Sequence, residues 1–358
     1  MSGGRQATPR MTALINTFNY GRFIEEAIAS VLAQGVAESE VEVIVVDDGS
    51  TDDTRARVEH FGNRVRYVWK PNGGQSSAVN LGYEQARGEI IALLDADDVW
   101  LPEKAGRVLE AFDRNPGSGM VLHKRFIWES RDGKLTEDAD LPQLSGAFPP
   151  GRDDLLRYGT TSTSAIAFRK EAARTVFPIP ETQTLHADSY LQALLPLVAP
   201  VAILNEPLAK YRVHAGNLYQ FAEAEPARTE ARLRATAAFV RETRAWMDGH
   251  GFDTQKPEYR AYFQRYELIE QVNRFQADQP GRLEFFKHLR LHRKVYRPLW
   301  TARYTAFRVA LEWLALAAGY GTFQKLRERS SQGGLQRRRE AWAPAQESQE
   351  VSVRRAML

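Results

Sequence analysis

Hydrophobic and polar positions in the first hundred residues alternate between two patterns. Short apolar runs, rich in β-branched residues, are typical of buried strands and occur at 12–16, 41–46, 65–69 and 90–94. In the segments between them apolar residues recur every three or four positions, which is typical of amphipathic helices. Continuous apolar strands that alternate with helices predict an α/β protein whose central sheet is mostly parallel and covered by helices on both faces.

The pattern changes after Pro102. A helix is predicted to about residue 115, and the signal then becomes mixed. Strands are predicted at 120–128, 163–169, 201–206 and 208–214, and short helices at 153–158 and 186–195. The predicted organisation is an N-terminal tail (1–10), an α/β domain (11–220), a mainly helical C-terminal extension (221–329) and a disordered tail (330–358).

The amino-acid composition limits the classes of protein and of site that the chain can form. The chain has 358 residues, 43% of them hydrophobic and 26% charged, as expected for a soluble globular protein. It has no cysteine, which excludes disulfides, thiolate zinc sites and a cysteine nucleophile. The first residues, MSGGRQATPR, lack the apolar core of a signal peptide, and no apolar stretch is long enough to span a bilayer. These features favour a cytoplasmic protein.

Positive charge gathers near the C-terminus. The segment 282–308 holds eight Lys or Arg residues and one Glu, interleaved with aromatic residues. Two interpretations remain open: peripheral contact of 282–308 with an anionic membrane surface, or packing of these helices onto the α/β domain. No nucleic-acid-binding motif accompanies the segment, so a nucleic acid is not expected as a partner.

Acidic residues follow two of the predicted strands directly. The sequence LLDADD places Asp95, Asp97 and Asp98 at the end of the fourth strand. Side chains two positions apart in an extended segment point the same way, so Asp95 and Asp97 converge. Mg²⁺ and Mn²⁺ prefer carboxylate oxygens together with substrate phosphates, and a bound ion relieves the repulsion between the carboxylates. The alternative is a solvated acidic turn.

The second acidic group is VVDDGS, after the strand at 41–46. Ligands of parallel sheets bind at the carboxyl ends of the strands, where both acidic groups lie. Asp48 is a candidate acceptor for an imide N–H such as N3 of uracil. The alternative is that Asp47 and Asp48 favour the N-terminus of the following helix, which Ser50 or Thr51 is predicted to cap.

Four segments together resemble the inverting family-2 glycosyltransferases of GT-A fold. They are INTFNYGRFIEEAIASVLAQ, VEVIVVDDGSTDDT, NGGQSSAVNLGYEQARGEIIALLDADDVWLP and YRVHAGN, which match in order and spacing between residues 12 and 217. The resemblance implies the GT-A (nucleotide-diphospho-sugar transferase) fold and transfer of a hexose from a nucleotide-sugar donor. Asn16 stands where the family often has Pro.

The same resemblance implies roles for individual residues. Thr17, Phe18 and Gly74 would belong to the donor nucleotide site, and Asp48 would read the base. Asp95 would contact the ribose or the metal, Mn²⁺ or Mg²⁺, and Asp97 would be the main metal ligand.

Two further residues come from the later part of the chain. The family places its general base at the start of a helix, usually as an acidic residue followed by Asp. TLHADSYLQALL offers Asp188 there, but Ala187 occupies the expected acidic position. A carboxylate that merely favours the helix N-terminus is the alternative for Asp188. His214 either completes the metal shell or is a surface histidine.

The expected activity is a metal-dependent, non-processive transfer from a UDP-sugar. The acceptor hydroxyl would belong to a glycan, a lipid-linked molecule or a protein, in the synthesis of a cell-surface polysaccharide or glycoconjugate. Two alternatives remain. In a haloacid-dehalogenase-like phosphohydrolase, Asp95 would be the nucleophile and Asp97 the general acid. In a non-catalytic relative, the chain would only bind a nucleotide sugar.

Overall fold

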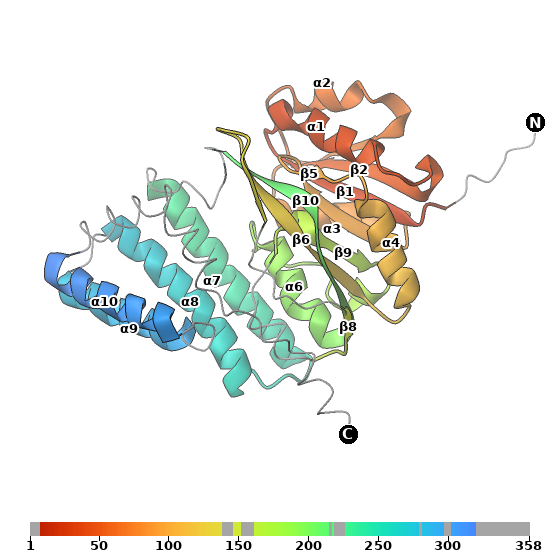
Figure 1. The fold of residues 1–358 in the computed structure, drawn as a ribbon. Coiled ribbons are helices and arrows are strands. Elements are labelled where there is room, and N and C mark those ends of the chain that lie inside the picture. The colour runs from red at the N-terminus through yellow and green to blue at the C-terminus, as the bar shows by residue number, and fades with distance from the viewer. Residues whose placement is uncertain are drawn as a thin grey trace, which may run out of the picture. The chain divides into compact units, whose positions relative to one another are not determined.

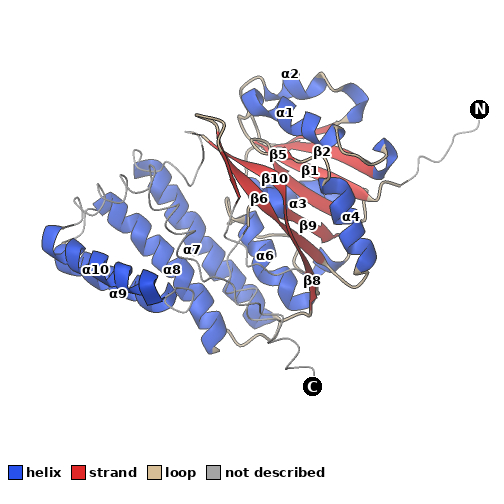
Figure 2. Ribbon diagram, viewed as in Figure 1, coloured by secondary structure: helices blue, strands red, loops and turns tan. Residues whose placement is uncertain are grey.

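The computed structural model describes residues 8–137, 146–151, 161–214, 217, 226–278, 281–296 and 302–319. The chain separates into two compact units, residues 1–260 and 261–358. The first unit contains the sheet, shown together with its helices in Figures 1 and 2. The predicted helix at 153–158 and the tails at 1–7 and 330–358 lie outside the described residues.

The first hundred residues form the predicted alternation of strands and helices. The strands are β1 (Met11–Thr17), β2 (Val41–Asp47), β3 (Arg66–Trp69) and β4 (Ile90–Asp95). The helices between them are α1 (Gly21–Leu32), α2 (Thr54–Glu59) and α3 (Gln75–Gln85). The predicted cap of α2 was wrong. That helix begins at Thr54, and its first amide donates to the carboxylate of Asp52 rather than to Ser50 or Thr51.

The remaining elements of the first unit extend the sheet and cover it. They are β5 (Val99–Trp100), α4 (Lys104–Arg114), β6 (Met120–Glu129), β7 (Leu135–Glu137), β8 (Gly146–Phe148), β9 (Ile166–Arg169), α6 (Ala187–Val198), β10 (Val201–Val213) and α7 (Pro226–Gly249). The strands predicted at 201–206 and 208–214 are one strand, β10, which continues past Pro207 through two irregularities in its register.

The strand order of the sheet is β3-β2-β1-β4-β9-β6-β10-β5. The first four strands are parallel neighbours, and β6 and β10 are also parallel. One antiparallel strand, β9, lies between β4 and β6. The predicted α/β architecture with a mostly parallel sheet is therefore confirmed. The strand β9 interrupts it, and β5, β7 and β8 add further antiparallel pairs.

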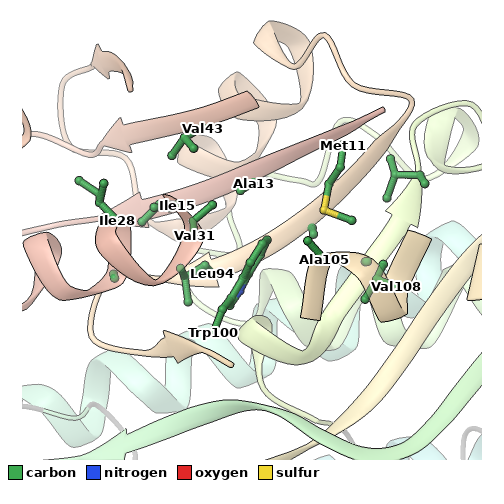
Figure 3. Close-up of a cluster of buried hydrophobic side chains, with 14 of the residues drawn as sticks. Met11, Ala13, Ile15, Ile28, Val31, Val43, Leu94, Trp100, Ala105 and Val108 are labelled. Carbon is green, nitrogen blue, oxygen red and sulfur yellow. The ribbon is translucent and has the colours of Figure 1, made fainter. Parts of the chain in front are cut away.

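The two faces of the sheet bury alternate residues of the same strands. Ala13 and Ile15 of β1 join Val31 of α1 and Val108 of α4 in one hydrophobic cluster, which Figure 3 shows. Leu14, between them, points to the opposite face and lies against Gly82 of α3. Because successive strand residues point to opposite faces, an unbroken apolar strand requires helices on both sides.

The second unit is helical. It contains most of α8 (Pro257–Asp278), followed by α9 (Arg282–Tyr296) and α10 (Ala302–Ala318). These helices and α7 lie in the segment predicted to be mainly helical. Among the residues that the structure describes, no helix combines the length and the hydropathy needed to cross a bilayer.

Two helical glycines test the packing of α3 against β1. A Cβ atom at Gly82 would overlap Leu14, which is fully buried, whereas the nearest atom to a Cβ at Gly106 of α4 is Val36 Cγ1 at 3.8 Å. We expect Gly106→Ala to raise the free energy of unfolding by about 1 kcal/mol, the difference in helix propensity. Gly82→Ala should lower it by about 1–3 kcal/mol through overpacking. Urea unfolding measures both, and stabilisation by Gly82→Ala would contradict this packing.

Candidate active site

The carboxyl ends of β1 and β4 hold the first polar contact of the site. The parallel register places Asn16 directly beside Asp95. The side-chain amide of Asn16 donates a hydrogen bond to Asp95 Oδ1 at 2.9 Å. The residue that replaces the family's usual Pro thus holds one carboxylate of the acidic motif in place.

The three carboxylates of the LLDADD motif have different surroundings. Asp98 is fully buried and accepts hydrogen bonds from Ser164 Oγ at 2.5 Å and from the backbone N–H of Arg212 at 2.9 Å. Ser164 Oγ also accepts from the backbone N–H of Asp95. Asp98 therefore ties the motif to β10 and to the turn before β9, and it faces away from solvent.

A buried lysine lies beside Asp98. Lys104 of α4 donates to the carbonyl oxygen of Ser164 at 2.7 Å, and its Nζ lies 4.1 Å from the centre of the Trp100 ring. Burial lowers the pKa of Lys104 well below its usual value, while burial and the neighbouring carboxylates raise the pKa of Asp98. The sequence has no basic residue within the motif, but the fold brings the amine of Lys104 from the next helix beside Asp98.

Asp97 meets the residues of the YRVHAGN segment. His214 Nε2 lies 3.1 Å from Asp97 Oδ2, and the amide of Asn217 lies 3.4 Å from the same oxygen. The His214 side chain is only 7% exposed and packs 4.6 Å from the ring of Phe23. The interpretation of His214 as a surface histidine was wrong, because the end of β10 carries it into the site.

Arg212 has a structural role in this arrangement. Its Nε donates to the backbone carbonyl of Asp97 at 2.7 Å, and its guanidinium forms an ion pair with Glu26 of α1. The guanidinium also lies 4.0 Å from the centre of the Trp128 ring. Arg212 thus positions the acidic motif by binding the backbone of Asp97.

Negative charge at this edge is concentrated and poorly hydrated. Burial raises the pKa of Asp95 to about 7, with further contributions from Asp97 and Asp188. Burial and the same motif also raise the pKa of Tyr20 and of Tyr211. Within the described part of the chain, no three His, Asp or Glu side chains gather closely enough to hold a metal by themselves. Crowded carboxylates with an adjacent imidazole fit a divalent cation that takes its remaining ligands from a substrate.

Asp188 faces the acidic motif from the first turn of α6. Asp188 Oδ2 accepts from Thr163 Oγ1 at 3.5 Å, and Thr163 Oγ1 in turn accepts from Gln75 Nε2 at 3.2 Å. Gln75 Nε2 also lies 3.3 Å from Asp95 Oδ1. Two uncharged side chains therefore connect Asp188 with Asp95, although neither was identified from the sequence.

The position before Asp188 is fully buried. Ala187 has no exposed surface, and its backbone N–H lies 3.4 Å from Gln75 Oε1. An acidic side chain at this point would lose its hydration without a cation to compensate. The small side chain of Ala187, in place of the family's usual acidic residue, is therefore consistent with the local packing.

Asp48 organises the loop that leads into α3. Its Oδ1 accepts from Lys70 Nζ at 2.6 Å and from the Gly73 N–H at 3.0 Å. Its Oδ2 accepts from the Gly74 N–H at 2.7 Å and from the Asn72 amide at 3.1 Å. The alternative that Asp48 favours the helix after β2 was wrong, because its partners belong to the loop after β3.

The other predicted donor-site residues lie at the same edge. Gly74 has a φ of +89°, and a Cβ atom there would lie 2.7 Å from the backbone of Thr184, so only glycine fits without strain. Thr17 ends β1 and is 3% exposed, and its hydroxyl is buried without a partner among the described residues. Phe18 is 45% exposed and offers an aromatic surface beside the site.

Comparisons with known proteins show which family this chain resembles. The profile of glycosyl transferase family 2 matches residues 12–177. An uncharacterised glycosyltransferase of Nostoc sp. is 34% identical over 239 residues, which cover 63% of this chain and 71% of the relative. An uncharacterised protein of Mycobacterium tuberculosis is 29% identical over 219 residues, which cover 59% of this chain and 61% of the relative.

Two solved structures share the fold. The structure of residues 1–349 of Staphylococcus aureus TarS in complex with UDP aligns with a TM-score of 0.58 at 16% identity, covering 86% of this chain and 90% of that one. The mannosyltransferase PcManGT from Pyrobaculum calidifontis, in complex with GDP-Man and Mn²⁺, aligns with a TM-score of 0.50 at 17% identity. The alignment covers 89% of this chain and 83% of that one.

These findings define the class of the protein. The chain belongs to glycosyl transferase family 2 and has the α/β fold of the GT-A transferases. It is therefore a glycosyltransferase, which favours that hypothesis over a haloacid-dehalogenase-like phosphohydrolase.

The contacts of Asp48 predict a measurable effect on its loop. Removing the carboxylate in Asp48→Ala leaves the Gly73 and Gly74 amides without acceptors. A hydrogen bond to a charged group contributes about 1.5–3 kcal/mol, so hydrogen exchange at these two amides should accelerate roughly 10- to 100-fold. Asp53→Ala, which removes only an exposed carboxylate paired with Arg57, should leave them unchanged. Unaltered exchange in Asp48→Ala would show that the loop does not depend on this carboxylate.

Proposed function

We propose that this glycosyltransferase moves a hexose from a nucleoside-diphosphate sugar to an acceptor hydroxyl with inversion at C1, in a metal-dependent reaction. The arrangement of Asp95 and Asp97 at the end of β4, opposite Asp188 at the start of α6, carries this proposal. It supports a cation at Asp97 and a proton acceptor at Asp188 near one edge of the sheet, the two groups that a direct displacement needs.

UDP is the proposed nucleotide. TarS, whose fold this chain shares, has been captured with UDP and with UDP-GlcNAc. Asp48 is the proposed acceptor for the uracil imide. Since both of its oxygens already accept two hydrogen bonds, the base would displace one donor, and the Asn72 amide at 3.1 Å is the longest of the four. Thr17, Phe18 and Gly74 complete the proposed nucleotide site.

Asp97 and His214 are the proposed metal ligands, with Asp95 at the ribose or the metal. When bound, Mn²⁺ or Mg²⁺ would stabilise negative charge on the diphosphate leaving group. His214 Nε2, 3.1 Å from Asp97 Oδ2, is the nitrogen that would face the metal, while Nδ1 lies 3.3 Å from the Arg22 guanidinium.

Asp188 is the proposed general base. As the acceptor oxygen bonds to C1 of the sugar, the bond from C1 to the diphosphate oxygen breaks and the hydroxyl proton passes to the Asp188 carboxylate. Thr163 and the backbone N–H of Ser189 hold that carboxylate at the start of α6. The transfer is proposed to be non-processive, with a glycan, a lipid-linked molecule or a protein as acceptor.

A non-catalytic relative is the remaining alternative, because Ala187 replaces an acidic residue. The contacts of Asp188 favour catalysis, since Thr163 and Gln75 connect its carboxylate with that of Asp95. Turnover of UDP-sugars by the wild-type protein that is lost in Asp188→Asn would exclude this alternative.

Removing Asp97 should abolish most of the activity. We expect Asp97→Ala to lower turnover by about 10²-fold or more, the usual effect of losing one preorganised electrostatic partner. Calorimetry with Mn²⁺ and UDP should show weaker binding of the metal. Asp113→Ala, at an exposed carboxylate of α4 paired with Arg10, is the matched control and should behave as wild type. Unchanged metal binding in Asp97→Ala would exclude Asp97 from the metal shell.

Asp188→Asn should separate catalysis from binding. Because a base acts only in the transition state, we expect kcat to fall by about 10²–10⁴-fold while the Kd of the donor stays within about twofold. Steady-state kinetics and calorimetry with the UDP-sugar measure the two quantities. A loss of donor affinity that equals the loss of kcat would assign Asp188 to donor binding instead.

A further inference from the structure

The second unit carries a helical surface that the catalytic site does not use. Helices α9 and α10 pack against each other, and Arg293 of α9 forms an ion pair at 2.8 Å with Glu312 of α10, whose side chain is 3% exposed. The rings of Phe286 and Trp313 lie 5.2 Å apart across the same pair of helices. Because both contacts cross between the helices, they set how α9 and α10 face each other.

The outward side of this pair is apolar. Leu283 and Leu291 of α9 are 59% and 42% exposed, and Trp313 and Leu314 of α10 are 60% and 39% exposed. On α10 these two residues continue a strip of exposed alanines at helical spacing: Ala306, Ala310 and Ala317. Four of the eight large hydrophobic side chains that are exposed in the described part of the chain therefore lie on these two helices.

Basic side chains lie among the exposed leucines of α9. Lys287 and Arg290 are both exposed and follow Leu283 by four and seven positions, on the same side of the helix. The exposed acidic residue of this helix is Glu284. The surrounding sequence, 282–308, has eight Lys or Arg residues, and Glu284 is its single acidic residue, so its net charge is strongly positive.

We propose that this surface, the α9–α10 face formed by Leu283, Lys287, Arg290, Leu291, Trp313 and Leu314, docks on a bilayer that contains anionic lipids. An amphipathic helix pair binds in the membrane interface when apolar side chains enter the boundary of the acyl chains and cations meet the headgroups. The tryptophan and the leucines supply the apolar contact, and Lys287 and Arg290 supply the charge.

Charge favours a bilayer over a second copy of the chain. In a twofold-symmetric dimer through the α9–α10 face, the same patch meets itself, so the basic residues of one copy approach those of the other. Like charges brought together in this way oppose association. An anionic lipid surface instead complements them.

Vesicle flotation of the full chain tests the proposal without reference to transferase activity. We expect the protein to float with vesicles of 70% phosphatidylcholine and 30% phosphatidylglycerol at 50 mM salt. Binding to vesicles of phosphatidylcholine alone should be at least about tenfold weaker, and 500 mM salt should weaken binding to the anionic vesicles because it screens the headgroup charge.

Two pairs of variants locate the contact. Lys287→Glu combined with Arg290→Glu should weaken anionic-vesicle binding by roughly 25-fold or more, about fivefold for each lost cation. Arg131→Glu combined with Lys134→Glu makes the same change of net charge at two exposed residues near β7. This control pair should weaken binding to anionic vesicles far less. Trp313→Ser should weaken binding about tenfold, whereas Trp69→Ser, at a tryptophan 53% exposed on β3, should not.

Circular dichroism and thermal unfolding establish that each variant is folded. Equal effects of the α9–α10 variants and their controls would overturn the proposal, as would equal binding to neutral and anionic vesicles. Light scattering gives the mass in solution. A dimer that Trp313→Ser dissociates, with no vesicle binding by the wild-type protein, would assign the α9–α10 face to self-association instead.

Discussion

The buried carboxylate of Asp98 is the constraint on which the site depends. It has no exposed surface, and it is satisfied by Ser164 and by the backbone N–H of Arg212. Lys104 adds a buried amine bonded to the Ser164 carbonyl. A buried polar group without partners costs about 1–3 kcal/mol or more, so these contacts fix the turn after β4 in one conformation. That conformation directs Asp95 and Asp97 toward the carboxyl edge of the sheet.

The same edge connects residues from five distant positions in the chain. Asn16 at the end of β1 holds Asp95, and Gln75 and Thr163 connect Asp95 with Asp188. Uncharged amides and hydroxyls in these positions orient the carboxylates without neutralising them. The negative charge is therefore left for a cation and for an acceptor proton, which are the two partners that the proposed reaction needs.

Much of the fold was predictable because its signals are local. The four strands at 12–16, 41–46, 65–69 and 90–94 were predicted to within one or two residues, since buried parallel strands are unbroken apolar runs. The split of β10 into two strands was wrong, because Pro207 interrupts the pattern while the strand continues through irregular register. The predicted cap of α2 was wrong because Ser50 Oγ accepts a hydrogen bond from the backbone N–H of Asn19 in another loop.

The sequence by itself determined the fold class, the family and the edge of the sheet at which the acidic residues gather, because strand period and motif spacing are properties of neighbouring residues. Only the tertiary structure decided what each carboxylate does. Asp98 meets Ser164 and Arg212 from 66 and 114 positions away, and Asp97 meets His214 from 117. Asp48 meets Gly74 from 26 positions away. Desolvation and hydrogen bonding depend on these distant partners, and no local pattern encodes how deeply each of the three carboxylates of the motif is buried.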